Sequence, residues 1–249
     1  MKINERGGRM ETLNQMNVKF ACPAEMAEVL PRPVLAVRGL PEWFKAMQQS
    51  SFSAVSSKNV MTVKKCPPFI DAMTYGFLMP LVSDLVVENG EFSWSSEIPA
   101  VASLPNLTRS PIDYHDSAQV KETPFFDKDQ FIIKFNNFWT IALPPGYSLL
   151  VTHPINRLDL PFMTITGLVD SDRYVDSLVH FPARWTDPNF SGVLPKGTPV
   201  AQCLPIRREA IVEEFRTLSE EAVQRLRDTG RAVSTEASVY RHEFRAPKR

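Results

Sequence analysis

The stretch TGLVDSDRYVDSLVHF at residues 166–181, followed by VLPKGTPVAQCLPI at 193–206, decides how this chain folds. Both stretches consist of short apolar runs separated by polar or Gly/Pro-containing turns, which is typical of β-strands. In the first, the apolar run stops at Asp170, and a second carboxylate, an arginine and a tyrosine follow before the next apolar run. The sequence therefore predicts two strands joined by a polar segment at 170–174, and another strand in the second stretch.

Proline is the outlier of the composition, with 21 residues against 10 glycines. It is excluded from helix interiors and central sheet positions, but it suits strand starts, sheet edges and turns. Its spread from Pro23 to Pro205 predicts many short strands. Between LVSDLVV and EFSWSS, the dipeptide Asn89-Gly90 predicts a hairpin, because both central residues of a type I′ turn need positive φ.

Three other segments have clear patterns. PEWFKAMQ starts at Pro41, which suits the first position of a helix, and it predicts a short helix. SKNVMTVKKC predicts a strand that ends before the proline pair at 67–68. QFIIKFNNFWTIALPPGYSLLVTHPI predicts two strands around the turn LPPGYS.

The hydrophobic period changes from about Glu209 onward. Apolar residues recur at steps of three and four, which predicts an amphipathic helix, with Gly230 as its C-terminal cap. We expect this helix to pack back on the sheet, or alternatively to dock on a neighbouring subunit. The apolar positions are Ile211, Val212, Phe215, Leu218, Ala222, Val223 and Leu226.

The patterns divide the chain into a mobile N-terminus at 1–17, a β-rich domain at 18–206, and a C-terminal helix with a basic tail at 207–249. The predicted fold class is mainly β, a compact barrel or sandwich of short strands with a C-terminal amphipathic helix.

The overall composition is that of a globular protein, with 249 residues, of which 43% are hydrophobic. The 28 basic and 28 acidic residues cancel, so the basic excess typical of nucleic-acid-binding proteins is absent. Cys22, Cys66 and Cys203 have no disulfide-framework or zinc-site spacing, and we expect a reduced, cytoplasmic setting. We expect neither a signal peptide nor a membrane span, because no apolar run is long enough.

GLVDSDRYV at 167–175 and LPKGTPVAQ at 194–202 resemble two motifs of the trimeric dUTPases and the related dCTP deaminases. The resemblance covers residues 143–206 and implies a β-clip fold, a nucleotide pocket and a homo-oligomer. By position, Asp170 matches an aspartate that engages sugar and water. Tyr174 matches, one residue late, a tyrosine that stacks on deoxyribose.

Other positions depart from that family. THPINRLD stands where the family has an Arg-Ser-Ser helix start, and Val175 stands where it has glycine. The family's glycine-rich C-terminal arm has no counterpart, since Gly230 is the only glycine after residue 229. The resemblance therefore implies a pocket rather than dUTP hydrolysis.

Across most of its length the chain also resembles an uncharacterised family of bacterial and phage proteins, which implies one fold and no particular catalytic residue. The segments that carry this resemblance are KKCPPFIDAMTYGFLMPL, NGEFSW, PPGYSLLVTHPINR, GLVDSDRY and GTPVAQCLPIRRE.

The polar segment 170–174 has two interpretations. Asp and Ser are common in turns because they hydrogen-bond their own backbone. Two carboxylates beside an arginine can instead position a water or a ligand hydroxyl. As a site, Asp170 would be the catalytic residue. The ligand-binding residues would be Asp172, Arg173, Tyr174, Arg157 and Gln202.

In this hypothesis Asp170 orients water or a hydroxyl, Tyr174 stacks, and Arg157 or Arg173 neutralises an anion. The leading prediction is a protein that binds, and as an enzyme modifies, a small polar or nucleotide-like ligand, with Mg²⁺ as cofactor for a nucleotide.

Two other functions stay open. The first is a non-catalytic structural or assembly protein, phage-derived, whose C-terminal helix and tail make the contacts. The second is a mononuclear metal enzyme with iron or zinc, in which histidines and an aspartate hold the ion. Its candidate ligands are His115, His153 and His180.

Overall fold

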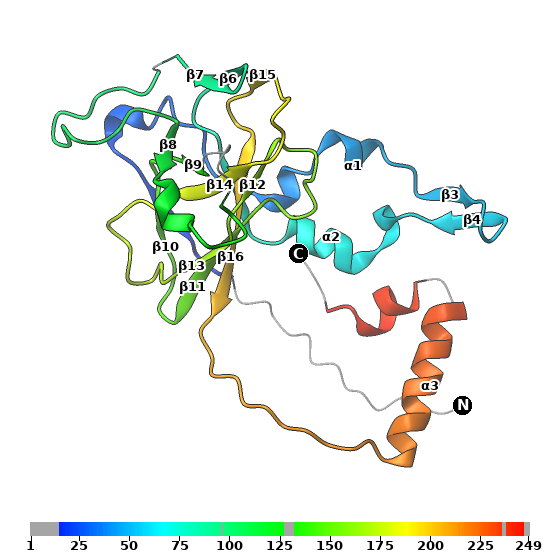
Figure 1. The fold of residues 1–249 in the computed structure, drawn as a ribbon. Helices are drawn as coiled ribbons and strands as arrows, with labels where there is room; N and C mark the ends of the chain where they lie inside the picture. Colours follow the sequence, from blue (N-terminus) through cyan, green and yellow to red (C-terminus); the bar gives the residue numbers. More distant parts are fainter. Residues whose placement is uncertain (1–14, 96, 127–131, 236–237, 247–249) are drawn as a thin grey trace.

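The computed structural model describes residues 15–95, 97–126, 132–235 and 238–246, and it shows a mainly β body with helical elements at its edge and C-terminal end (Figure 1). The predicted fold class is confirmed, since the body consists of several small antiparallel sheets and the chain ends in a helical region. The mobile N-terminus that the sequence predicts falls mostly on residues 1–14, outside the described residues.

The largest sheet of the described chain is built around β16 (Pro199–Arg207). On one side β16 pairs with β11, and on the other with β5, where Cys203 lies opposite Phe77. Residues 200–203 are all buried, so this part of β16 is covered on both faces. The antiparallel order is β13 (Gly167–Val169), β11 (Tyr147–Thr152), β16, β5 (Phe77–Pro80) and β2 (Val34–Leu35).

A four-stranded sheet supplies much of the aromatic core. Phe135 and Phe162 are fully buried, and their ring centroids lie 4.7 Å apart in an edge-to-face contact. Burial of a side chain of this size contributes about 1.5–3 kcal/mol each. The strand order is β12 (Phe162–Thr164), β14 (Phe181–Trp185), β9 (Ile132–Phe135) and β8 (Ile112–His115).

Smaller antiparallel sheets complete the β structure. The hairpin predicted at Asn89-Gly90 is confirmed, because the two residues have φ angles of 52° and 80°. The strands are β15 (Gly192–Leu194), β6 (Leu85–Glu88) and β7 (Glu91–Ser93) in one sheet, β1 (Lys19–Ala21) with β10 (Thr140–Ala142), and β3 (Ser50–Ser53) with β4 (Lys58–Met61).

Helical elements are short except for one. The helix predicted in PEWFKAMQ is confirmed, with Pro41 as its N-cap rather than its first residue. The α-helices are α1 (Glu42–Ala46), α2 (Pro67–Thr74) and α3 (Glu220–Thr235). The single turns are η1 (Ala24–Met26), η2 (Ala36–Arg38), η3 (Val63–Lys65), η4 (Ser117–Val120) and the π-helical η5 (Tyr240–Phe244).

Some predicted strands have other bounds or partners. Within SKNVMTVKKC only β4 is a strand, and η3 follows it. The two strands on either side of LPPGYS exist as β10 and β11, but they belong to different sheets, so this turn joins sheets rather than closing a hairpin. The stretch at 166–181 provides β13 as predicted, but the second strand, β14, begins only at Phe181, so residues 175–180 are not part of the strand that the sequence predicts there. The next stretch provides β16.

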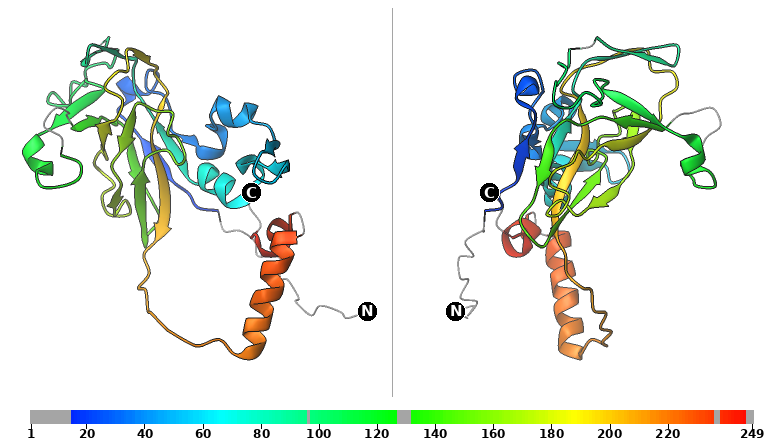
Figure 2. Two further views of the ribbon diagram at one scale, coloured as in Figure 1. Left: turned by 45° about the vertical axis from the view of Figure 1, so that its right-hand side comes forward. Right: turned by 90° about the vertical axis from the view of Figure 1, so that its left-hand side faces the viewer.

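The C-terminal helix differs most from the prediction. It begins at Glu220 instead of near Glu209, and it continues through Gly230 instead of ending there. Residues 206–221 are all exposed, and the extended part leads away from the sheets to α3 (Figures 1 and 2). The expectation that the helix packs on the sheet is wrong, because α3 has no buried residue. A helix depends on tertiary packing for most of its stability, and within the described residues the apolar side chains before 220 are exposed rather than packed.

Gly76 and Gly90 provide a matched test of the central pairing. Both have positive φ, but a Cβ at Gly76 would lie 2.1 Å from the carbonyl oxygen of Cys203, whereas one at Gly90 would meet nothing within 4 Å. We expect Gly90→Ala to lower the free energy of unfolding by about 1–2 kcal/mol. Gly76→Ala should cost about 2 kcal/mol more, because β5 and β16 must separate. Urea unfolding measures both, and equal costs would contradict the close approach.

Candidate functional site

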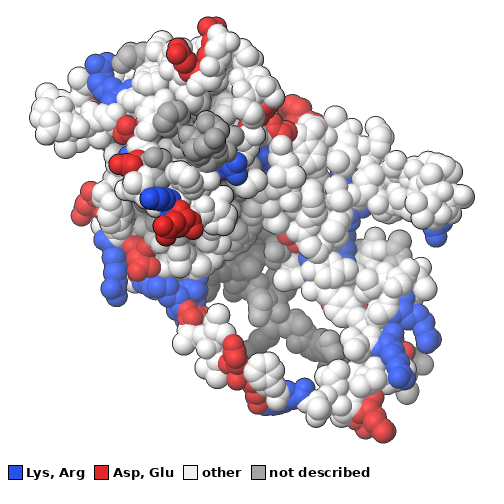
Figure 3. Space-filling view, in the orientation of Figure 1, with Lys and Arg blue, Asp and Glu red and all other residues white. Residues whose placement is uncertain are grey.

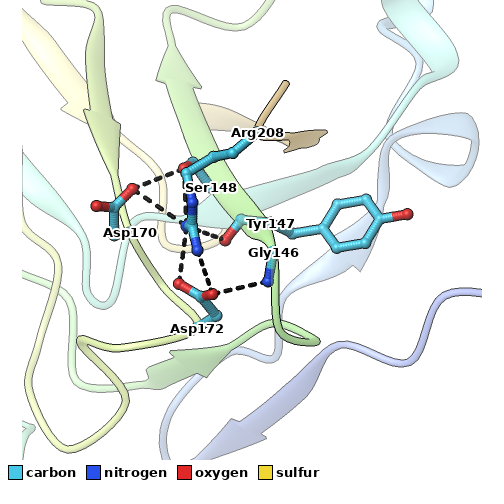
Figure 4. Close-up of polar contacts among 6 residues, drawn as sticks. All are labelled: Gly146, Tyr147, Ser148, Asp170, Asp172 and Arg208. Carbon is cyan, nitrogen blue, oxygen red and sulfur yellow. Dashed lines mark hydrogen bonds and ion pairs between the residues drawn. The ribbon is translucent and has the colours of Figure 1, made fainter. Parts of the chain in front are cut away.

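The polar segment 170–174 lies beside the ends of two strands of the central sheet. It follows β13, and its backbone turns back at Asp170, whose carbonyl oxygen accepts hydrogen bonds from the amides of Arg173 and Tyr174 at 2.9 Å. The carboxylates of Asp170 and Asp172 face Arg208, the residue directly after β16 (Figure 4). The register of β16 with β11 brings these side chains together, since Tyr147 lies opposite Arg207.

Asp172 is the most enclosed of the three charged residues of this cluster, with a side chain 7% exposed. Its Oδ1 accepts a hydrogen bond of 2.8 Å from Nη1 of Arg208, and its Oδ2 accepts one from Nη2. The backbone amide of Gly146 donates to the same Oδ2 at 2.8 Å. Such a two-pronged arginine–carboxylate pair is both strong and geometrically specific. Asp172 therefore fixes the place where Arg208 leaves the sheet.

Asp170 is held at one oxygen only. Its Oδ1 accepts hydrogen bonds from the hydroxyl of Ser148 at 2.7 Å and from Nη1 of Arg208 at 3.3 Å. Its Oδ2 has no hydrogen-bond partner among the described residues and points away from the cluster in Figure 4. Because the side chain is 55% exposed, this oxygen is accessible from outside.

The charges of the cluster compensate one another. The hydrogen bonds from Arg208, followed by that from the Gly146 amide, hold the pKa of the Asp172 carboxyl well below its usual range. In return, the bond to Asp172 raises the pKa of the Arg208 guanidinium. With two carboxylates and one guanidinium, Asp170, Asp172 and Arg208 together have a formal charge of minus one.

Arg173 and Tyr174 lie on the surface beside this cluster. Tyr174 is 48% exposed, and its hydroxyl accepts a hydrogen bond of 2.8 Å from Ser177. Arg173 is exposed. Both are therefore near Asp170 along the chain and open to solvent.

Arg157 belongs to a separate ion pair. Its guanidinium donates to both oxygens of Asp159 at 2.9–3.1 Å, and the indole of Trp43 donates to the same carboxylate at 3.2 Å. These bonds tie the loop after β11 to α1. The guanidinium of Arg157 is thus bound to Asp159, two residues further along the chain, rather than open to a ligand.

Gln202 is buried in the middle of β16, with 1% exposure. Its Oε1 accepts a hydrogen bond from the amide of Ile155 at 2.9 Å, and its Nε2 donates to the carbonyls of Ala72 and Tyr75. The amide group thus links β16 with the end of α2 and the loop after β11. It is not placed with Asp170 in the structure.

The three histidines proposed as metal ligands lie apart. In the described part of the chain, no group of three His, Cys, Asp or Glu side chains is arranged to hold a metal. His153 bonds the carbonyl of Arg157, His180 accepts from the amide of Asn137, and His115 contacts Gln119. Burial lowers the pKa of His153 and of His180, so both favour the neutral form. The geometry gives the metal-enzyme hypothesis no support.

Arg208, Ser148 and Gly146 are the members of the cluster that sequence reasoning missed. Each lies far from 170–174 in the chain, and only the pairing of β11 with β13 and β16 brings them there. The signal available in the sequence was the pair Arg207-Arg208 directly after a strand, beside an acidic turn.

Comparisons with known proteins show similarity only to solved structures. Neither a family model nor a curated protein matches the chain, so the resemblance to an uncharacterised family is unsupported. A mutant dUTPase from phage phi11 of S. aureus aligns with a TM-score of 0.34 and 9% identity, over 83% of this chain and 99% of its own. A mutant dUTPase of Staphylococcus bacteriophage 80alpha, solved with dUpNHpp, aligns with a TM-score of 0.33 and 13% identity, over 84% and 94%.

Both of these similar structures are phage dUTPases. At such values the comparisons assign no family. No helix within the described ranges is long and apolar enough to cross a membrane.

The Asp172–Arg208 pair predicts a specific dependence of stability on pH. Because the folded-state pKa of Asp172 is depressed, its stabilisation is present above the ordinary aspartate pKa of about 3.9 and is lost as pH falls toward the folded value. Asp172→Asn should therefore be less stable than the natural chain at pH 7, and the difference should shrink by pH 3. Urea unfolding at both pH values measures this.

Arg208→Gln is the partner variant in this experiment. It should remove the same pH-dependent component, and adding Asp172→Asn to it should change the acid dependence little. A difference between natural chain and Asp172→Asn that is the same at pH 7 and pH 3 would contradict the ion pair.

Proposed function

We propose that the protein is a self-assembling protein whose C-terminal arm, residues 209–246, joins one copy of the chain to another. The observation that carries this proposal is the exposure of apolar side chains in the extended part of the arm. Ile211 is 92% exposed, Val212 88% and Phe215 88%, and Leu218 follows with 61%. These are the residues whose period predicts one apolar helix face.

Such a surface favours a partner on energetic grounds. Full burial of each of these side chains would contribute about 1.5–3 kcal/mol, a gain that the isolated chain does not realise. Large exposed apolar surfaces in soluble proteins mark sites of interaction. The pattern continues in α3, where Leu226 is 63% exposed and Val233 47%.

The end of the arm contacts a surface formed by α2 and β4. The guanidinium of Arg245 contacts the carboxylate of Asp71 in α2 at 3.0 Å and 2.5 Å, and Val239 is buried. A hollow of about 700 Å³ lies between β4, the start of α2, the last turn of α3 and η5. The tail therefore binds a formed surface, while residues 209–221, which connect it to the sheet, stay exposed.

The same surface of α2 and β4 can bind the tail of a second copy. Exchange of an identical element between protomers needs no new contact, only a connection that can reach the neighbour. The extended connection after Arg208 supports this, and in Figure 2 it runs outside the β body before α3 begins. The balance of 28 basic and 28 acidic residues means that copies carry no net charge to oppose association.

A second exposed surface lies next to the arm. The β3–β4 hairpin projects from the body, and Figure 3 shows it largely without charged side chains on the visible face. Phe52 is 67% exposed, Met61 65% and Val55 100%. β4 and the end of α3 line the same hollow, so the hairpin lies beside the C-terminal end of α3 and adds apolar surface that a second copy can cover.

The first test is the mass of the purified chain across a range of concentrations, measured by analytical ultracentrifugation. We expect a homo-oligomer that dissociates on dilution and a monomer when residues 209–249 are deleted. Ile211→Ser with Phe215→Ser should weaken association about tenfold or more, because two buried apolar side chains are lost. Leu158→Ser, at an exposed apolar residue outside the arm, is the matched control.

A cysteine pair separates exchange from simple folding back. In a chain with Cys22 and Cys66 replaced by serine, Asp71→Cys with Arg245→Cys should oxidise to covalent dimers and larger species. A disulfide found only within single chains, together with a monomeric mass at all concentrations, would overturn the proposal.

Binding of a small polar or nucleotide-like ligand at Asp170 is the second candidate function. It is supported by the unpartnered Oδ2 of Asp170, which lies on the surface near the exposed Tyr174. Asp172 and Arg208 would set the position of Asp170, while Arg157 and Gln202 have structural bonds elsewhere. In this function Asp170 orients a ligand hydroxyl or water and Tyr174 stacks.

A thermal-shift panel of nucleotides and deoxynucleotides, with and without Mg²⁺, tests this second function. A ligand at 100 times its dissociation constant should stabilise the fold by about 2.7 kcal/mol. Asp170→Asn should abolish the shift, whereas Glu91→Gln, an exposed acid on the β6–β7 hairpin, should leave it unchanged. If no ligand changes the melting temperature, or if Asp170→Asn retains the shift, this second function is excluded.

A further inference from the structure

Two neighbouring cavities lie on either side of the short segment that follows β1. The larger has a volume of about 460 Å³ and is lined by Phe20, Ala21, Cys22, Ala27, Arg32, Pro33 and Trp139. The smaller has a volume of about 230 Å³ and shares Ala21 and Cys22 with it. Binding sites for small molecules in proteins have volumes of about 300–1,000 Å³, so the larger cavity is of suitable size.

The larger cavity combines aromatic walls with a single cation. Phe20 is held by an edge-to-face contact with Phe77, with ring centroids 5.0 Å apart. The indole of Trp139 donates a hydrogen bond of 3.1 Å to the carbonyl of Pro31, which fixes the ring against the segment that carries Arg32. These rings are therefore oriented before any ligand arrives.

Arg32 is the charged group of this cavity. It is exposed, and its guanidinium has no ion-pair or hydrogen-bond partner within the described ranges. This distinguishes it from Arg157, Arg208 and Arg245, each of which has a carboxylate partner. An unpaired guanidinium beside aromatic walls suits an anionic group at the end of a flat ring system.

The smaller cavity limits how such a ligand can lie. Its walls are mostly apolar, with Leu104, Leu107, Phe138 and Leu178 among them, and its charged residue is Asp176. Among the described residues no cation pairs with the Asp176 carboxylate, so this carboxylate repels an anionic group. An anionic group is thus directed to Arg32, and an apolar substituent can extend past Cys22.

We propose that the larger cavity binds a planar aromatic anion, whose ring lies against Phe20 and Trp139 and whose anionic group is bound by Arg32. A nucleoside monophosphate and an aromatic carboxylic acid both have this chemistry. The site is separate from the Asp170 cluster and does not depend on self-assembly of the chain.

Cys22 offers a direct reporter of occupancy. Its thiol lines both cavities, while Cys203 is buried in β16 and Cys66 is exposed at the start of α2. Burial raises the pKa of the Cys22 thiol, against a smaller opposite effect of Arg32, so alkylation should be followed at pH 8.5. With Cys66 replaced by serine, Cys22 is the accessible thiol.

The experiment measures the rate of alkylation of Cys22 by iodoacetamide in the full chain carrying Cys66→Ser. The probes are 5′-nucleoside monophosphates and bicyclic aromatic carboxylates, with inorganic phosphate and acetate as anions that have no ring. We expect one of the two aromatic classes to protect Cys22 in a saturable way and the two simple anions to leave the rate unchanged. Which class protects identifies the source of the ligand.

Two arginine variants complete the design. Arg32→Gln should raise the concentration needed for protection about tenfold or more, because a charge-assisted contact is lost. Arg38→Gln, an exposed arginine in η2 outside the cavity, should leave it unchanged. Protection that Arg32→Gln retains, protection by phosphate alone, or no protection by any probe would each overturn the proposal. Asp170→Asn should retain it, which separates this site from the Asp170 cluster.

Discussion

The pairing of β16 with β11 on one side and β5 on the other is the interaction on which the rest of the structure depends. The strand joins segments that are far apart in sequence and buries residues 200–203 between the layers. Two local features hold it there. Gly76 allows the backbone of β5 to approach the carbonyl of Cys203, and the amide of Gln202 bonds three backbone groups outside the sheet. A side chain at position 76 would clash with the carbonyl of Cys203. An apolar side chain at position 202 would leave three partly buried backbone groups without this hydrogen-bond partner.

The polar cluster is a consequence of this pairing. Because β16 pairs with β11, Arg208, the residue after β16, lies next to the turn at 170–174. There the carboxylates of Asp170 and Asp172 pair with its guanidinium. The cluster therefore anchors the point at which the chain leaves the body. It also explains why the arm begins abruptly, with a fixed guanidinium on one side and freely exposed residues on the other.

Local features of the sequence predict local structure well here. Asn89-Gly90 specifies its hairpin because the turn needs positive φ at two adjacent residues, and proline spacing predicts short strands because proline has no N–H to donate to a neighbouring strand. The acidic turn after Val169 was recognisable because Asp and Ser are typical turn residues. The partner of that turn was not, because Arg208 reaches it only through a strand register that no local pattern encodes.

The C-terminal helix shows the same limit of prediction from local sequence patterns. Apolar residues do recur with helical spacing from Ile211 to Leu226, but this spacing does not say which surface the apolar face packs against. Where no such surface is present, the residues before 220 stay extended. Gln202 was singled out as a ligand residue because it lies in the stretch that resembles the second dUTPase motif, and in the structure its amide bonds backbone groups of the protein itself.

The position of β16 near the end of the chain also determines the order of folding. β2 and β5 are synthesised long before their central partner, so Phe77, Leu78 and Met79 have no strand on one side until residues 199–207 follow. Pairing across such a distance is slow, since a long loop must close before any contact repays it. Until then β5 has β2 on one side and an unpaired apolar edge on the other, and such exposed edges favour misassembly.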